Sequence, residues 1–255
     1  MNENIKSANP LGTQKESKLL VKFAIPCIIS MLVTALYNIV DQIFIGQGIG
    51  INGNAATNIT FPLSTTCTAI SLLLGIGSAT NVSLKLGAKE EEEAANYAGC
   101  GICLMTIFGL ALFAFTSILL TPMLKFFGAT AEVLPYAQEY TRIVAIGFPF
   151  LIANTGMSKL TLADGSPRYS MISMLIGAIV NTILDPIFIF TLDMGMRGAA
   201  LATILGQIVS FCISLRYMFH FKTIRLRRRC FRIRGNNFAN IMRLGASACF
   251  NQIAM

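Results

Sequence analysis

The chain has 255 residues, of which 54% are hydrophobic and only 13% carry a charge, and its mean hydropathy is +0.65. The charged fraction is about half the usual share of a soluble domain. A soluble protein of this size could not cover its surface with so few charges, so the composition excludes that class. It indicates that lipid solvates much of the protein surface.

Long apolar blocks separated by short polar breaks predict the membrane-spanning helices. A helix needs roughly 20 apolar residues to cross the hydrocarbon core of a bilayer. Six blocks reach this length, at residues 19–45, 59–84, 94–120, 135–162, 169–191 and 197–219. A seventh begins near Phe238 and continues to Met255. This pattern predicts an all-α membrane protein, because the strands of a β-barrel are short and alternate in polarity.

The distribution of Lys and Arg predicts the orientation of the spans. Residues 1–18 are polar, and the first block is too long for a signal peptide, so we expect it to stay as a span. With the N-terminus inside, all but three of the 20 Lys and Arg residues fall on the cytoplasmic side, the exceptions being Lys125, Arg142 and Arg197. The positive-inside rule therefore predicts a cytoplasmic N-terminus. The basic stretch 224–234 is expected to contact anionic lipid rather than nucleic acid.

Two carboxylates inside the apolar blocks are the first candidates for function. Asp41 and Asp185 each cost roughly 2.5–3.5 kcal/mol at the centre of a bilayer, so such residues usually face a cavity or a partner. Asp41 shares one helix face with three other polar residues at helical spacing, Thr34, Tyr37 and Asn38. The alternative is that both Asp residues are interfacial and point out toward water.

Further polar positions lie in the second, fifth and sixth blocks. Asn181 is one turn before Asp185, and Pro186 removes a backbone donor, so we expect a disturbed helix there. Thr203 and Gln207 are one turn apart on one face of the sixth block. The second block is rich in Thr and Ser, whose hydroxyl groups either form a polar site or bond back to their own helix. The Cys100 to Cys103 spacing lacks a second Cys pair or a nearby His, so we assign no metal or redox site to it.

Several of these stretches resemble one transporter family. Residues 37–46, YNIVDQIFIG, resemble the first-span motif of the multidrug and toxic compound extrusion (MATE) transporters, and residues 54–58 and 61–63 look like their MepA-like branch. Further similarity lies at residues 87–89, 163–167, 181–188 and 195–203. The resemblance covers nearly the whole chain, and the order and spacing of the motifs are specific to the family.

The resemblance implies a fold of twelve helices in two six-helix lobes around a central cavity. This chain is similar to the N-terminal half of that fold. We therefore expect a cytoplasmic tail at residues 1–18, a six-helix lobe at 19–219, a basic cytoplasmic loop at 220–237 and the truncated start of a second lobe at 238–255. A lobe on its own is expected to expose the polar faces of Asp41, Asn181 and Thr203 to lipid.

The resemblance also implies roles for individual residues. A cation site is expected from Asp41, Asn181, Asp185 and Thr203. A substrate cavity for cationic amphipathic drugs is expected from Thr34, Tyr37, Asn38 and Gln207. The coupling ion is H⁺ or Na⁺, and we expect no cofactor and no other metal. Two carboxylates close together in a medium of low dielectric resist joint ionisation, so one of them should hold a proton or a cation.

The resulting hypothesis is multidrug efflux by H⁺ or Na⁺ antiport across the cytoplasmic membrane, without enzymatic activity. One alternative is a non-transporting fragment or membrane scaffold that needs a complementary C-terminal half. A second is an intramembrane aspartyl protease, in which two Asp residues share a proton. That alternative expects a Gly-x-Gly-Asp context, whereas Asp185 lies in the sequence ILDP.

Overall fold

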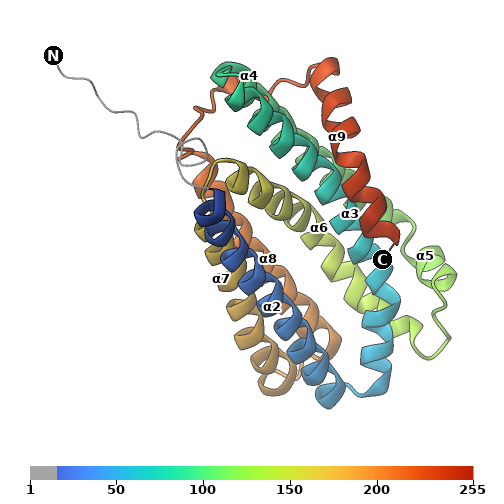
Figure 1. Ribbon diagram of the computed structural model, residues 1–255. Helices are drawn as coiled ribbons and strands as arrows, with labels where there is room; N and C mark the ends of the chain where they lie inside the picture. Colours follow the sequence, from blue (N-terminus) through green and yellow to red (C-terminus); the bar gives the residue numbers. More distant parts are fainter. Residues whose placement is uncertain (1–15, 255) are drawn as a thin grey trace.

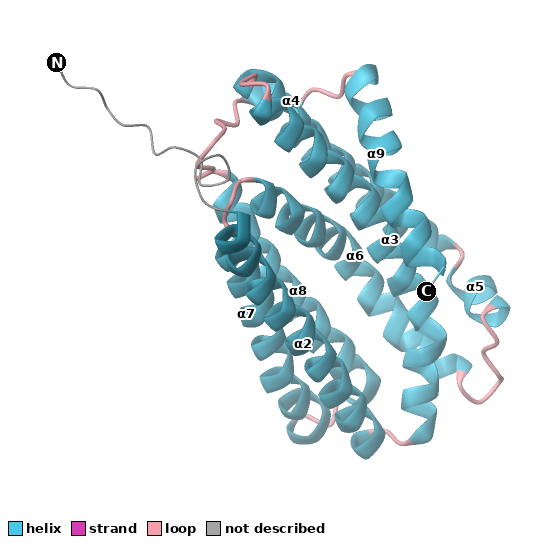
Figure 2. Cartoon of the chain, in the orientation of Figure 1, coloured by secondary structure: helices cyan, strands magenta, loops and turns pink. Residues whose placement is uncertain are grey.

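The computed structural model describes residues 16–254, and the regular elements of this part are all helical (Figure 2). Six helices are long and apolar enough to cross a membrane: α2 (Glu16–Gly48), α3 (Ile51–Gly87), α4 (Glu91–Ile118), α6 (Leu134–Ala163), α7 (Pro167–Pro186) and α8 (Gly195–Met218). The remaining elements are α5 (Leu120–Phe126), the π-helix η1 (Ile187–Thr191), the 3-10 helix η2 (Arg228–Phe231) and α9 (Gly235–Ala254). The predicted all-α membrane fold is confirmed.

The ends of the predicted segments differ from the observed helices in several places. Residues 1–15 of the predicted tail lie outside the described residues, and residues 16–18 belong to α2. Helix α3 begins eight residues before the predicted second span, directly after Gly50, whose φ of 89° turns the chain. Residues 235–237, predicted to belong to the basic loop, form the first turn of α9.

The third predicted span, residues 94–120, contains a break that the hydropathy pattern hides. The backbone of Leu119 leaves the helical conformation, with φ −103° and ψ 21°, so α4 ends there and the short helix α5 begins. Pro122 lies in the first turn of α5, where the missing N–H has no helical acceptor to lose. Sequence analysis missed the start of α5 because Leu119 and Leu120 continue the apolar run across the break.

The disturbance predicted at Pro186 takes the form of a change in helix type. Helix α7 ends at Pro186, and the chain continues as the π-helix η1. Without a proline N–H, the carbonyl of Thr182 loses its helical partner, which favours a wider turn. Helix α8 packs closely against this turn, because a Cβ at Gly198 would lie 2.9 Å from the carbonyl carbon of Phe188.

Helix α6 forms the centre of the lobe, where it contacts α3, α4 and α8. Its side chains Phe148, Ile152 and Leu160 are completely buried. Helix α2 lies at one side and packs mainly along α7 (Figure 1). The lobe therefore brings α2, α7 and α8, which carry the predicted cation ligands, into one layer next to α6.

Helix α9 packs along α3 (Figure 1). Gly77 of α3 lies against the carbonyl oxygen of Ile241, and Gly245 of α9 lies against that of Leu73, both closer than a Cβ would allow. Asn240 donates a hydrogen bond of 2.8 Å to the hydroxyl of Tyr97 on α4. Helix α9 is not among the six helices apolar enough to span a membrane. Its contacts are those of a helix docked on the six-helix lobe.

Candidate functional site

Two carboxylates from different helices meet inside the lobe. Asp41 on α2 and Asp185 on α7 are 9% and 0% exposed, because α2 packs along α7. The two carboxyl groups lie close enough to interact with each other. Asn181, one turn before Asp185, donates a hydrogen bond of 3.4 Å from Nδ2 to Asp185 Oδ1. The alternative that both Asp residues point out toward water does not match their burial.

The expectation that this lobe exposes its polar faces to lipid is wrong. Asp41 and Asn181 are buried, and Thr203 is half-buried. The cause is close packing between α7 and α8, since a Cβ at Gly206 would lie 3.1 Å from the Cβ of Asn181. A glycine one turn from Thr203 therefore lets α8 cover the cluster, so the six helices enclose it without help from another lobe.

Three oxygen atoms of this cluster lack a hydrogen-bond partner among the described residues: Asp41 Oδ1, Asn181 Oδ1 and Asp185 Oδ2. A buried polar atom without a partner costs about 1–3 kcal/mol, so three in one place indicate a site rather than simple packing. Carboxylate and amide oxygens are ligands for hard cations. Among the described residues, no group of three or more His, Cys, Asp or Glu could hold a metal ion.

Thr203, the fourth predicted cation ligand, bonds to its own helix and lies near a tyrosine of α6. Its hydroxyl donates a hydrogen bond of 3.0 Å to the carbonyl of Ala199, and the residue lies near Tyr140 on α6. Tyr140 is 9% exposed and lies near both Asp41 and Asp185. Sequence analysis missed Tyr140, because a single tyrosine in an apolar span is typical of packing.

Gln42 is a second residue that sequence analysis did not select. Its Nε2 donates a hydrogen bond of 3.3 Å to Asp41 Oδ2, and its Oε1 accepts one of 3.0 Å from the hydroxyl of Thr57 on α3. The Thr57 hydroxyl also contacts the carbonyl of Asn54 at 2.9 Å. Gln42 therefore connects the buried carboxylates to the space between α2 and α3.

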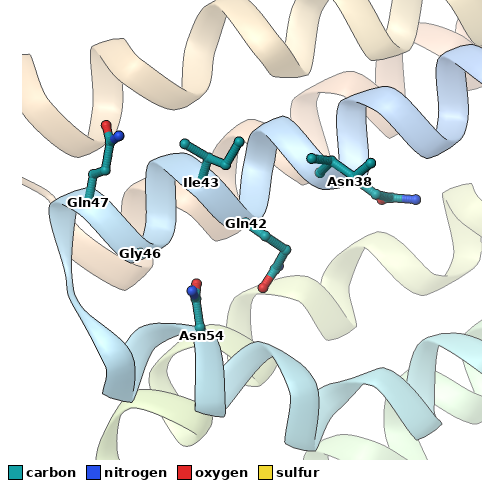
Figure 3. Close-up of a pocket in the computed structure, with 7 residues that line it drawn as sticks. Asn38, Gln42, Ile43, Gly46, Gln47 and Asn54 are labelled. Carbon is teal, nitrogen blue, oxygen red and sulfur yellow. The ribbon is translucent and has the colours of Figure 1, made fainter.

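That space is an open groove with a volume of about 600 Å³ (Figure 3). Its lining combines amide and aliphatic side chains: Asn38, Ile39, Gln42, Ile43, Gly46, Gln47 and Asn54. Figure 3 shows Gln42 and Asn54 pointing from α2 and α3 into the gap between the two helices. The groove carries no charged side chain, and Asp41 lies behind it, one hydrogen bond away through Gln42.

The four residues predicted to line a substrate cavity occupy different places. Asn38 lines the groove. Thr34 and Tyr37 are half-buried on α2, and Tyr37 lies near both carboxylates. Gln207 is apart from them, because its Oε1 lies against Gly147 between α8 and α6. Tyr37 thus lies near the carboxylates and Asn38 lines the groove, the two places that Gln42 connects. Gln207 lies in the contact between α6 and α8.

The order of these helices and their polar residues has a counterpart among known proteins. The MatE family profile matches residues 26–187, a stretch that includes Asp41, Asn181 and Asp185. The chain belongs to the MATE family. The resemblance stated from the sequence motifs is thereby confirmed.

A curated relative and solved structures agree with this MATE assignment. The chain is 30% identical over 193 residues to the multidrug export protein MepA of Staphylococcus haemolyticus. The aligned stretch covers 76% of this chain and 43% of that protein. A structure described as the outward-facing conformation of a multidrug resistance MATE transporter matches with a TM-score of 0.90 and 28% identity, over 98% of this chain and 55% of that one. A transporter from Pyrococcus furiosus matches with the same TM-score and identity. The chain spans less than half the length of the curated relatives it matches.

Proposed function

We propose that this MATE chain carries the cation-binding lobe of a multidrug exporter that exchanges H⁺ or Na⁺ for drug across the cell membrane. The observation that carries the proposal is the proximity of Asp41 and Asp185, two buried carboxylates with oxygens that have no partner among the described residues. The family membership and the MepA relative support the transport of drugs.

The proposed cation site is Asp41, Asn181, Asp185 and Thr203. A proton or a Na⁺ ion neutralises the repulsion between the two carboxylates, which is strong in a medium of low dielectric. Loss of that cation leaves two negative charges in contact, and this favours a packing in which α2 and α7 separate. Cation binding thus shifts the equilibrium between two arrangements of the lobe. Coupling of cation binding to drug transport requires such a shift.

The proposed substrates are small cationic amphipathic drugs, which contact the groove between α2 and α3. Its apolar side chains Ile39 and Ile43 suit the hydrophobic part of such a molecule, and the amides of Asn38 and Gln47 suit its polar groups. Asp41 supplies negative charge behind Gln42. A cationic drug and the coupling cation would therefore compete for the same negative charge, that of Asp41.

The proposed orientation puts the N-terminus and the basic segment after α8 in the cytoplasm. The ends of α3 and α8 and the start of α4 lie at one end of the bundle, with Lys85, Lys89 and the residues of 222–234 (Figure 1). The opposite end holds Arg197, which pairs with Glu139. The positive-inside rule favours this orientation.

Cation binding can be measured on the full chain in lipid nanodiscs, without any transport. We expect the melting temperature to rise with Na⁺, compared with choline at equal ionic strength, or with acid. A cation at 100 times its Kd stabilises the folded state by about 2.7 kcal/mol. Asp41→Asn and Asp185→Asn should abolish this dependence.

Asp193→Asn is the matched control, because Asp193 is exposed in the turn before α8. It removes the same charge away from the cluster and should keep the cation dependence. A wild-type chain that responds to neither Na⁺ nor pH, or an equal response in all three variants, would contradict the proposed cation site.

A further inference from the structure

A second cavity lies at the end of the bundle where α3 ends and α4 begins. It has a volume of about 980 Å³, and the segment that follows α8 forms its other wall. Figure 1 shows this segment passing next to the start of α4. Five basic side chains line the cavity: Lys89, Lys222, Arg225, Arg227 and Arg229. None of them belongs to the cation site or to the drug groove.

The charges of this basic cavity are not balanced by ion pairs. Glu91 and Glu92 are its two acidic lining residues, which leaves an excess of three positive charges. The neighbouring Glu90 and Glu93 both pair with Lys85. In the described part of the chain, the only other ion pair joins Arg197 to Glu139, so the five basic lining residues form none. These five basic side chains can therefore bind an anion without first breaking an ion pair.

The basic segment is anchored at both ends rather than free in solution. At its start, the buried carboxylate of Asp164 accepts hydrogen bonds of 2.9 Å from the backbone N–H groups of Lys222 and Thr223, and one of 2.6 Å from the hydroxyl of Tyr217. Ile224, the next residue, is 3% exposed. The loop between α6 and α7 thus fixes the entry to the segment.

The other anchor lies on α4. Cys230 is buried, and its carbonyl oxygen lies against Gly99, closer than a Cβ would allow. Cys103, one turn further along α4, donates from Sγ to the carbonyl of Phe231 at 3.2 Å. The residues between the two anchors, 224–229, are therefore held over the cavity. Their positions are set before any ligand arrives, which lowers the entropic cost of binding.

We infer that the basic cavity binds a phosphate-bearing anion, either the headgroup of an anionic lipid or a free phosphate compound. Arg and Lys are the side chains that recognise phosphate oxygens, Arg through its planar fork and Lys as a point charge. The cavity lies level with the ends of two membrane-spanning helices, where lipid headgroups are found. Its buried residues Ala95 and Ile224 give it an apolar floor. Both sources of phosphate fit this chemistry, so experiment must separate them.

The test uses the full chain in nanodiscs and two variants that lose three positive charges each. Arg225, Arg227 and Arg229 are changed together to Gln in the first variant. Arg232, Arg234 and Arg243 are changed together to Gln in the matched control, since they are exposed and do not line the cavity. Retention of phosphatidylglycerol against phosphatidylcholine is measured by native mass spectrometry. We expect the first variant to lose at least about tenfold in retention and the control to lose little.

A second arm tests the soluble source. Inorganic pyrophosphate is added to the chain in discs of phosphatidylcholine alone, and the melting temperature is followed. Stabilisation of the wild type that the first variant lacks assigns the cavity to free phosphate compounds. Retention of phosphatidylglycerol without a response to pyrophosphate assigns it to lipid. A wild-type chain that binds neither probe would overturn the inference, as would equal losses in the two triple variants.

Glu91→Gln combined with Glu92→Gln covers the case in which the triple Arg variant fails to fold. Both carboxylates face the cavity and repel a phosphate, so their removal should raise the affinity for the probe severalfold. Unchanged or weaker binding in that variant would show that the cavity does not hold the anion.

Discussion

The hydroxyl of Thr57 on α3 donates a hydrogen bond of 3.0 Å to Gln42 Oε1 on α2. The Gln42 amide faces Asp41 with Nε2, because an ionised carboxylate only accepts hydrogen bonds, and Oε1 is left on the side of Thr57. The groove and the buried carboxylates consequently share one side chain. A drug that draws Gln42 away removes a hydrogen bond from Asp41.

The first prediction concerns this shared side chain. Gln42→Ala should strengthen cation binding at Asp41 about threefold to tenfold, because the Gln42 N–H stabilises the ionised carboxylate and competes with the cation. A hydrogen bond to a charged group contributes about 1.5–3 kcal/mol, and the effect is smaller here since Gln42 is only partly buried. The cation-dependent shift in melting temperature in nanodiscs measures the change. Gln47→Ala is the control, since Gln47 lines the same groove without touching Asp41. Equal effects of the two variants would argue against a role for Gln42 in the cation site.

The second prediction concerns transport. The chain is expressed in a drug-sensitive host together with the part of a staphylococcal MepA that follows the matched region. Asp41→Asn should abolish cation-dependent efflux of a cationic dye while the protein level in the membrane stays constant. Fluorescence of the retained dye is the readout, and Asp193→Asn serves as the control. Unchanged efflux in Asp41→Asn would remove Asp41 from the mechanism.

The third prediction concerns orientation. The turn between α2 and α3, which contains Gly50, and the segment between α8 and α9, which contains Arg229, lie at opposite ends of the bundle (Figure 1). A reporter enzyme fused after Arg229 should be active in the cytoplasm, and one fused after Gly50 should be active outside. The positive-inside rule is the physical basis. A cytoplasmic reporter at Gly50 would reverse the proposed topology.

The fourth prediction concerns the docking of α9 on α3. Gly245→Ala places a methyl group against the carbonyl of Leu73, so the helices must separate at a cost of about 1–3 kcal/mol. Thermal unfolding should show a lower melting temperature, and limited proteolysis should cut near residue 235 first. Gly87→Ala is the control, because nothing lies near its Cβ position. A Gly245→Ala chain as stable as the control would mean that α9 does not depend on this contact.

Much of the fold was predictable because membrane helices depend on local composition. Apolar length located the six spans, and the helical spacing of Asn181 and Asp185 selected two residues that lie together in the structure. Hydropathy could not locate the break at Leu119, since both of its flanks are apolar. In the hydroxyl-rich second span, side-chain hydroxyl groups mostly donate hydrogen bonds to carbonyls of their own helix. Thr60 and Thr68, for example, bond to carbonyls one turn earlier.

The parts of the site that escaped prediction depend on contacts between distant helices. Tyr140 and Gln42 have no sequence pattern that sets them apart, and only the placement of α6 and α3 next to the carboxylates reveals them. Gln207 and Ser210, one turn apart on α8, contact two different neighbours. Gln207 lies against α6, whereas Ser210 donates to the carbonyl of Ser173 on α7. A face of one helix can thus serve two partners, which periodicity alone does not show.

The double anchoring of the segment after α8 also makes it a fixed reference point. A chain held at Thr223 by Asp164 and at Cys230 by Gly99 cannot swing independently of the six helices. A spin label placed at Arg227 therefore turns with the lobe as a rigid body. Distances measured from that label to another part of a transporter would record the rotation of the lobe itself, free of the local motion that usually blurs a loop position.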